Sequence, residues 1–224
     1  MPTPARRTGP RASCARLIVA ALVACIGGLT GAQPASAQSG KTIALGGGVA
    51  HYRPVADDAH ASTGFAFVYR LGRPEGWRPA IGLNWFNTKF DTRVAGDEVD
   101  LGELRVRPIM GGYGYTVRRG RLAATGSAVG GVAFNSFKEA DAVRLAYAQS
   151  LDRTLLRISA GNSLAARGEI SLWWDLNERL GLLGVVGYVV ARPTISIVSD
   201  TGTEERRLKA DSVKLQIGIA YGIF

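Results

Sequence analysis

Large apolar residues alternate with small or polar ones at the end of the chain, in the segment SVKLQIGIAYGIF at 212–224. One parity runs from Val213 to Ile223 through leucine, isoleucine and tyrosine, whereas the other contains Lys214, Gln216, two glycines and an alanine. Because successive side chains of a strand point to opposite faces, this pattern predicts a strand with one large apolar face and one small or polar face.

Segments of this alternating character recur along the chain, and we expect eight strands, at 41–52, 62–71, 78–90, 103–117, 121–137, 163–176, 180–192 and 211–224. Their connections alternate in length: those at 72–77, 118–121 and 177–180 are short, and those at 53–61, 91–102, 138–162 and 193–210 are long. Short turns at one end and long loops at the other are typical of an up-and-down barrel in an outer membrane. No later segment has the roughly 18 apolar residues that a membrane helix requires.

The small and polar parity indicates which face of these strands points inward. In the first segment it holds Ala44, Gly46, Gly48 and Ala50. A surface that faces water is rich in Lys, Glu and Asp, whereas the narrow lumen of an eight-stranded barrel is filled by side chains. The opposite parity, with residues such as Phe65, suits hydrocarbon. The large apolar face is therefore predicted to point outward.

Aromatic residues support a bilayer environment, since belts of aromatic side chains flank the aliphatic band of membrane barrels. We expect one belt at the short-turn end and a second at the long-loop end. The first contains Tyr69, Trp77, Tyr113, Tyr115, Trp174 and Tyr221, and the second contains Tyr52, Phe65, Phe86, Phe134 and Phe137.

The first 37 residues have the pattern of a secretory signal peptide. Four arginines precede the apolar core LIVAALVACIGGL at 17–29, and ASA at 35–37 offers a cleavage site before Gln38. We expect export by the Sec route and a mature domain at 38–224. Acylation of Cys25, in the lipoprotein-like segment LVAC at 22–25, is the alternative.

The net charge and the cysteine content of the predicted mature domain differ from those of the whole chain, because they exclude the predicted signal peptide at 1–37. It holds four of the 27 basic residues and none of the 18 acidic ones, so 38–224 carries 23 against 18, a net charge of +5 rather than +9. This modest excess argues against a nucleic-acid partner. Both cysteines, Cys14 and Cys25, also lie in it. A closed barrel in lipid satisfies its main-chain hydrogen bonds internally and needs no disulfide.

With its exported front, its eight alternating strands and its aromatic C-terminus, the whole of 38–224 resembles the small bacterial outer-membrane β-barrel family of the eight-stranded type. The resemblance implies an all-β fold, an eight-stranded antiparallel up-and-down transmembrane β-barrel with short periplasmic turns and long external loops. It places the protein, porin-like in architecture, in the outer membrane of a Gram-negative cell with both termini periplasmic. It also implies a barrel-insertion signal at Tyr221, Ile223 and Phe224, although Tyr221 precedes Phe224 by three residues instead of the usual two.

Charged residues on the small and polar parity form the candidate site. They are Arg70, Arg105, Arg107, Arg167, Glu169 and Lys214. Buried charges have to pair, and eight strands leave an interior just wide enough for side chains, so we interpret the set as a structural ladder of ion pairs. A narrow anion-preferring path lined by arginine is the alternative. Pro108 and the glycines at 111–112 suggest a β-bulge that would change the faces of Arg105 and Arg107.

Enzymatic and metal chemistry find little support in the sequence. The only two histidines are His51 and the one that ends DDAH at 57–60. A Ser–His hydrolase needs both groups close together, and no spacing links His51 to Ser62 or Ser163. One histidine and two carboxylates in a loop are a weak pattern for a cation site. We expect no enzyme activity, no metal site and no cofactor.

The loop at 138–162 has apolar residues at spacings of three and four, which predicts a short amphipathic helix. These residues are Val143, Tyr147, Leu151, Leu155 and Ile158. We expect this helix to pack on its own rim; a lid over the barrel mouth and a partner-binding surface are the alternatives.

The leading hypothesis for function is a small outer-membrane barrel with a structural or surface-interaction role. Its expected partners are outer-membrane lipid and lipopolysaccharide, the barrel-assembly machinery, and an external partner of the loops. The alternative is a narrow passage or carrier for small hydrophobic or anionic compounds, with 138–162 as a lid. A lipid-modifying enzyme that uses His51 and a soluble periplasmic carrier are two further classes.

Overall fold

Residues 43–71, 75–151 and 155–223 are described in a computed structural model of the chain, and all of them lie in the unit Ala37–Phe224. The predicted signal peptide and its cleavage site lie outside these residues. No helix in the described ranges is both long enough and apolar enough to cross a membrane.

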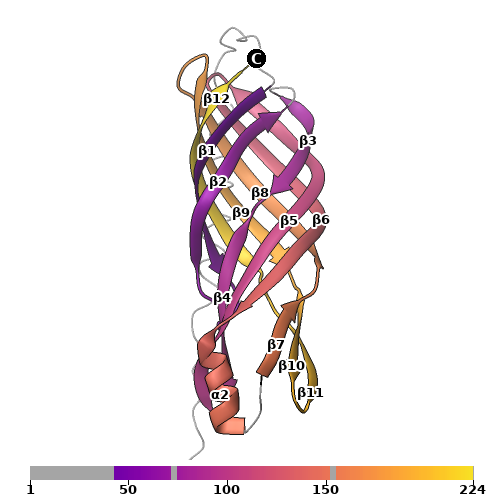
Figure 1. Ribbon diagram of the computed structural model, residues 1–224. Helices are drawn as coiled ribbons and strands as arrows, with labels where there is room; N and C mark the ends of the chain where they lie inside the picture. Colours follow the sequence, from indigo (N-terminus) through magenta and orange to yellow (C-terminus); the bar gives the residue numbers. More distant parts are fainter. Residues whose placement is uncertain (1–42, 72–74, 152–154, 224) are drawn as a thin grey trace, which may run out of the picture. The chain divides into compact units, whose positions relative to one another are not determined.

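Antiparallel strands dominate the described chain, and most of them curl into one large sheet (Figure 1). In spatial order they are β2 (Ser62–Leu71), β1 (Ile43–Pro54), β12 (Ser212–Gly222), β9 (Leu180–Ala191), β8 (Ser163–Asp175), β6 (Leu122–Glu139), β5 (Asp97–Arg119) and β3 (Gly76–Leu83). β4 (Phe86–Val94) pairs with the first part of β5, and β3 pairs with the last part. β3 and β4 are thus two halves of one interrupted strand, and the sheet is eight strands wide. This confirms the predicted antiparallel β-barrel fold.

Three of the four connections expected to be long loops contain regular structure. β4 and β5 continue beyond the expected strand ends into a hairpin at 91–102, whose turn has positive φ at Ala95 (51°) and Gly96 (102°). Two successive positive φ angles match the right-handed twist of a hairpin. The segment 193–210 forms the hairpin of β10 (Thr194–Ser199) and β11 (Gly202–Arg207).

The connection at 138–162 contains both a helix and a strand. Helix α2 (Asp141–Leu151) confirms the predicted helix, but Leu155 and Ile158 lie on strand β7 (Leu155–Ala160) instead. β7 joins β10 and β11 in a second, three-stranded sheet at the long-connection end (Figure 1).

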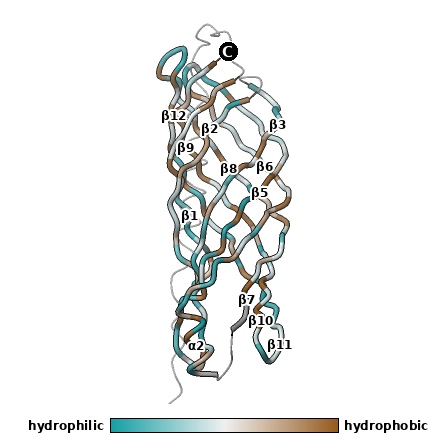
Figure 2. Tube along the Cα trace, viewed as in Figure 1, coloured by the Kyte–Doolittle hydropathy of each residue, from teal (hydrophilic) through white to brown (hydrophobic). Residues whose placement is uncertain are grey.

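Side chains of the barrel strands alternate between two environments, and Figure 2 shows the matching change of hydropathy along the chain. Large apolar residues on the outer face are exposed, among them Phe65 (68%), Leu164 (81%) and Ile217 (72%). On the inner face of β1, Gly48 leaves room for its neighbour: a Cβ there would lie 2.2 Å from the Ile217 carbonyl oxygen. The large apolar face therefore points outward, as expected.

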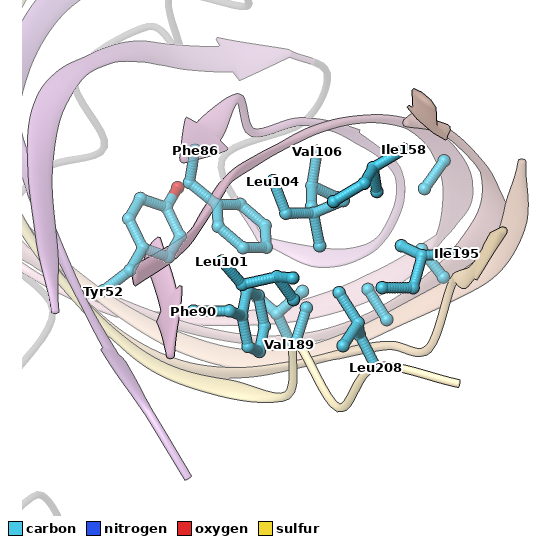
Figure 3. Packing of buried hydrophobic residues seen from close by; sticks show 14 of the residues in the cluster. Tyr52, Phe86, Phe90, Leu101, Leu104, Val106, Ile158, Val189, Ile195 and Leu208 are labelled. Atoms are coloured by element: carbon cyan, nitrogen blue, oxygen red, sulfur yellow. The ribbon is translucent and has the colours of Figure 1, made fainter. Parts of the chain in front are cut away.

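The interior at the long-connection end is apolar (Figure 3). Tyr52 and Phe86 stack there with ring centroids 4.7 Å apart, and Phe90 and Val143 are fully buried in the same cluster. The predicted external aromatic belt was wrong for Tyr52 and Phe86, because both occupy inward positions of their strands. We call this cluster the apolar interior; its largest members are Tyr52, Phe86, Phe90, Leu101, Leu104, Val106, Met110, Val129, Val143, Ile158, Val189, Ile195, Ile197 and Leu208.

Candidate functional site between β2 and β3

Strands β2 and β3 are the two edges of the curled sheet, and among the described residues no main-chain pairing joins them. Across the same line, nearer the long-connection end, an isolated bridge links Ala59 to Phe90. The His60 amide also donates to the Lys89 carbonyl at 2.9 Å. The barrel wall is thus joined by main-chain pairing at the level of Ala59 and Phe90. From there towards the short-turn end, β2 and β3 lack described strand pairing. We call the unpaired stretch the β2–β3 gap.

Side chains from the lumen supply hydrogen bonds to both edges of the β2–β3 gap. Arg167 on β8 donates from Nη2 to the Ile81 carbonyl of β3 at 3.4 Å. Gln216 on β12 donates from Nε2 to the Phe67 carbonyl of β2 at 3.3 Å. Because an unsatisfied main-chain group is costly in a membrane, these side chains stabilise edges that strand pairing leaves open.

A pocket of about 70 Å³ lies behind the gap. Residues of β2 and β3, among them Phe67 and Ile81, line it together with lumenal side chains, so it lies against the unpaired edges of both strands. The charged residues that line it are Arg70, Arg78, Arg167, Glu169 and Lys214. We call it the gap pocket.

One carboxylate in this pocket serves two cations. Glu169 Oε2 lies 3.1 Å from Arg167 Nε and 3.4 Å from Lys214 Nζ. Both cationic side chains are 3% exposed. Buried cations of this kind remain charged only with close partners, so Glu169 is central to the lumen.

A second carboxylate, Asp175, is shared in the same way. Its Oδ1 lies 3.6 Å from Arg70 Nη1, and its Oδ2 lies 2.5 Å from Arg118 Nη2. The Trp173 indole also donates to Asp175 Oδ1 at 2.6 Å, and the Arg70 guanidinium lies 5.4 Å from the Trp173 ring centroid. This layer fills the lumen on the short-turn side.

Arg78 is the least compensated cation of the gap pocket. It donates from Nη2 to Thr125 Oγ1 at 3.1 Å, and it has no ion-pair partner in the described chain. Within those same residues, Arg78 Nη1 and Arg70 Nη2 are buried without a hydrogen-bond acceptor. The lumenal charges described are five cations, Arg70, Arg78, Arg118, Arg167 and Lys214, against two carboxylates, Glu169 and Asp175.

The structure brings four of the six predicted site residues into the lumen: Arg70, Arg167, Glu169 and Lys214. Sequence reasoning missed Arg78, Arg118 and Asp175. The alternation of β3 could have predicted the lumenal position of Arg78, because Arg78 shares the inner face with the small residues Ala80 and Gly82.

The lumenal placement of Arg105 and Arg107 was wrong. β5 pairs with β6 without a register shift from Gly102 to Arg119, so the bulge suggested by Pro108 is absent. With continuous alternation, Arg105 and Arg107 share the outer face with Tyr113. Arg105 pairs with Glu103 at 3.2 Å, and Arg107 lies over the Trp85 ring at 5.7 Å.

The remaining candidate residues do not line the gap pocket. Tyr221 and Ile223 are exposed on the outer face, and Phe224 lies outside the described residues. His51 Nδ1 lies 2.8 Å from Thr63 Oγ1 on the neighbouring strand, and His60 Nε2 lies 2.6 Å from Asp91 Oδ2. The described residues contain no cluster of three metal-ligating side chains.

A curled antiparallel sheet with lipid-suited outer residues and a charged lumen defines the described chain as a transmembrane-type β-barrel. No family model and no curated protein matches the sequence. Among solved structures, the chain is similar to the solid-state NMR structure of outer membrane protein AlkL in DMPC lipid bilayers. The match has 14% sequence identity and a TM-score of 0.52, and it covers 86% of this chain and 95% of that one. At this identity the likeness shows the fold of an outer-membrane β-barrel.

Proposed function

We propose that this protein is an outer-membrane barrel that passes small apolar compounds from outside the cell into the membrane through the β2–β3 gap. The observation that carries the proposal is a pocket lined by residues of both β2 and β3, at a stretch of wall without described strand pairing. Hydrogen bonds from side chains, which change rotamer readily, stabilise the edges of this stretch. Its opening therefore breaks no described strand pairing between β2 and β3.

The apolar interior favours an entry route at the long-connection end. Its aromatic and aliphatic residues come from the barrel strands and from β4, β7, β10 and α2. Ligand sites for apolar compounds are lined by such residues. A compound that enters there displaces packed side chains and reaches the level of the gap pocket.

The short-turn half of the lumen disfavours continuation straight through the barrel. Asp175 with Arg70 and Arg118 occupies it, and Trp173 packs against them. An apolar compound would have to separate these buried ion pairs, which costs several kcal/mol for each charge left alone. An exit through the wall leaves the Asp175 ion pairs in place and breaks the hydrogen bonds from Arg167 to Ile81 and from Gln216 to Phe67.

The proposal includes an orientation. Long external loops and short periplasmic turns are the rule in outer-membrane barrels, so the α2 end faces outward and both termini face the periplasm. Export through the predicted signal peptide, and insertion through the C-terminal residues, complete this assignment. A purely structural role and an external protein partner stay predictions, and so does the absence of enzyme activity.

The experiment measures entry of the apolar fluorophore N-phenyl-1-naphthylamine into cells that express the full chain. Ser171 lines the gap pocket, and the neighbouring Leu172 points to lipid with 55% exposure. We expect expression to accelerate fluorophore entry, Ser171→Trp to abolish that gain, and Leu172→Trp to retain it. Heat-dependent gel migration verifies that each variant folds. A folded Ser171→Trp variant with the wild-type rate would overturn the route, and no gain from the wild type would favour the structural role.

A further inference from the structure

We infer that the gap pocket binds the acidic headgroup of an amphipathic compound, a carboxylate or phosphate monoester on an apolar chain, whose tail lies in the β2–β3 gap. The inference rests on the proposed function and names the class of compound for which the site is built.

Charge imbalance is the first argument. Four cations and one carboxylate, Glu169, line the pocket. Glu169 is already shared by Arg167 and Lys214, so it does not neutralise Arg78. Uncompensated buried cations are costly, and an anion in the pocket removes that cost.

Unused hydrogen-bond donors are the second argument. Arg78 Nη1 and Arg70 Nη2 are buried without an acceptor among the described residues. A guanidinium presents its donors in a planar fork that matches the oxygens of a carboxylate or a phosphate. An anionic headgroup satisfies both atoms, whereas a neutral apolar compound leaves them unpaired.

The apolar frame around the pocket is the third argument. Phe67 and Leu71 on β2, and Ile81 and Leu83 on β3, are among the residues that line it. A free inorganic anion makes no use of them. The volume of about 70 Å³ is well below the roughly 300–1,000 Å³ of pockets that enclose a whole ligand. The pocket therefore takes a headgroup, and the chain extends into the gap towards lipid.

The test uses the full chain purified from outer membranes in a non-ionic maltoside detergent. Calorimetric titration compares dodecanoate, dodecyl phosphate, 1-dodecanol and inorganic phosphate. We expect the two anionic amphiphiles to bind at least about tenfold more tightly than the alcohol or inorganic phosphate, as charge-assisted hydrogen bonds predict. Equal affinity for dodecanoate and 1-dodecanol would overturn the inference, and so would equal affinity for inorganic phosphate and dodecyl phosphate.

Two arginine variants locate the site. Arg78→Gln should weaken dodecanoate binding about tenfold or more without affecting 1-dodecanol, and Arg78→Lys should restore part of the affinity. Arg107→Gln is the matched control, since Arg107 lies on the outer face of β5. Equal losses in Arg78→Gln and Arg107→Gln would contradict the assignment.

The inference and the proposed function fail separately. If wild-type chain accelerates fluorophore entry but shows no preference for anionic amphiphiles, the inference fails and the passage stands. If the preference is present and depends on Arg78 while expression gives no faster entry, the passage fails and the headgroup site stands.

Discussion

The Arg167 guanidinium on β8 donates a hydrogen bond across the lumen to the main-chain carbonyl of Ile81 on β3, at an Nη2–O distance of 3.4 Å. The same guanidinium lies 3.1 Å from Glu169, and the Arg167 side chain is 3% exposed. A strand edge without a described strand partner is therefore tied to the buried ion pairs of the lumen.

Removal of the Arg167 guanidinium should destabilise the barrel. Arg167→Met leaves the Ile81 carbonyl without this donor and Glu169 with Lys214 as its described cation. Because Lys214 still pairs with Glu169, the main cost is the unsatisfied buried carbonyl, about 1–3 kcal/mol. We expect a loss of that size in the free energy of unfolding in urea, followed by tryptophan fluorescence in lipid vesicles. Arg107→Met on the outer face should cost about 1 kcal/mol or less. Equal losses would show that Arg167 contributes only as a surface arginine does.

Gly48 should be irreplaceable where the first and last strands meet. It pairs with Gly218, and a Cβ at Gly48 would lie 2.2 Å from the Ile217 carbonyl oxygen. Gly48→Ala should therefore push β1 from β12 and cost at least about 1–3 kcal/mol. Gly184→Ala is the control, because no atom lies within 4 Å of its added Cβ. The temperature at which the folded band disappears on a gel should fall for Gly48→Ala alone; the same fall in both variants would refute the steric explanation.

The strands and their outer faces could be predicted because a period of two is a local property of the sequence. Arg105 and Arg107 were misplaced although strict alternation of faces, counted back from Tyr113, puts both on the outer face. Only the bulge presumed at Pro108, which is absent, made their face ambiguous. The hairpins at 91–102 and 193–210 were missed because β11 and the last part of β4 carry polar and charged residues on both faces, although β10 itself alternates, with Ile195 and Ile197 on its buried face.

The β2–β3 gap could not be predicted, since parity determines the face of a residue and not the strand edge with which it pairs. Arg167 and Ile81 are 86 residues apart, and only the curl of the sheet brings them together. Glu169 and Asp175 belong to one strand, yet each receives cations from other strands. The set of lumenal partners is therefore a property of the tertiary structure.

Helix α2 should depend on a single buried valine for its place on the apolar interior. Val143 is 0% exposed, whereas Leu145, two residues along the helix, is 59% exposed. A buried unpaired carboxylate is costly, so Val143→Asp should release α2, and trypsin should cleave at Arg144 about tenfold faster or more in intact outer membranes. Leu145→Asp places the same charge in solvent and should leave the cleavage rate close to that of wild type. If both variants are cleaved at the wild-type rate, α2 is held by contacts other than Val143.

Asp211 should fix the long-connection end of β9, and its acceptor capacity should matter more than its charge. Its Oδ1 accepts from the Ala191 amide at 3.2 Å, and its Oδ2 accepts from Arg192 Nη2 at 2.8 Å. The hydrogen bond to Asp211 raises the pKa of Arg192, which stays cationic. Asp211 is 8% exposed and Arg192 48% exposed, so only the loss of Asp211 leaves a buried donor unsatisfied.

Asp211→Ala should cost about 1–3 kcal/mol and accelerate hydrogen exchange at the Ala191 amide. Asp211→Asn keeps an oxygen for that amide and should lie closer to wild type, and Arg192→Gln should change exchange least. Faster exchange in Arg192→Gln than in Asp211→Ala would show that the ion pair, and not the buried acceptor, holds this end of the strand.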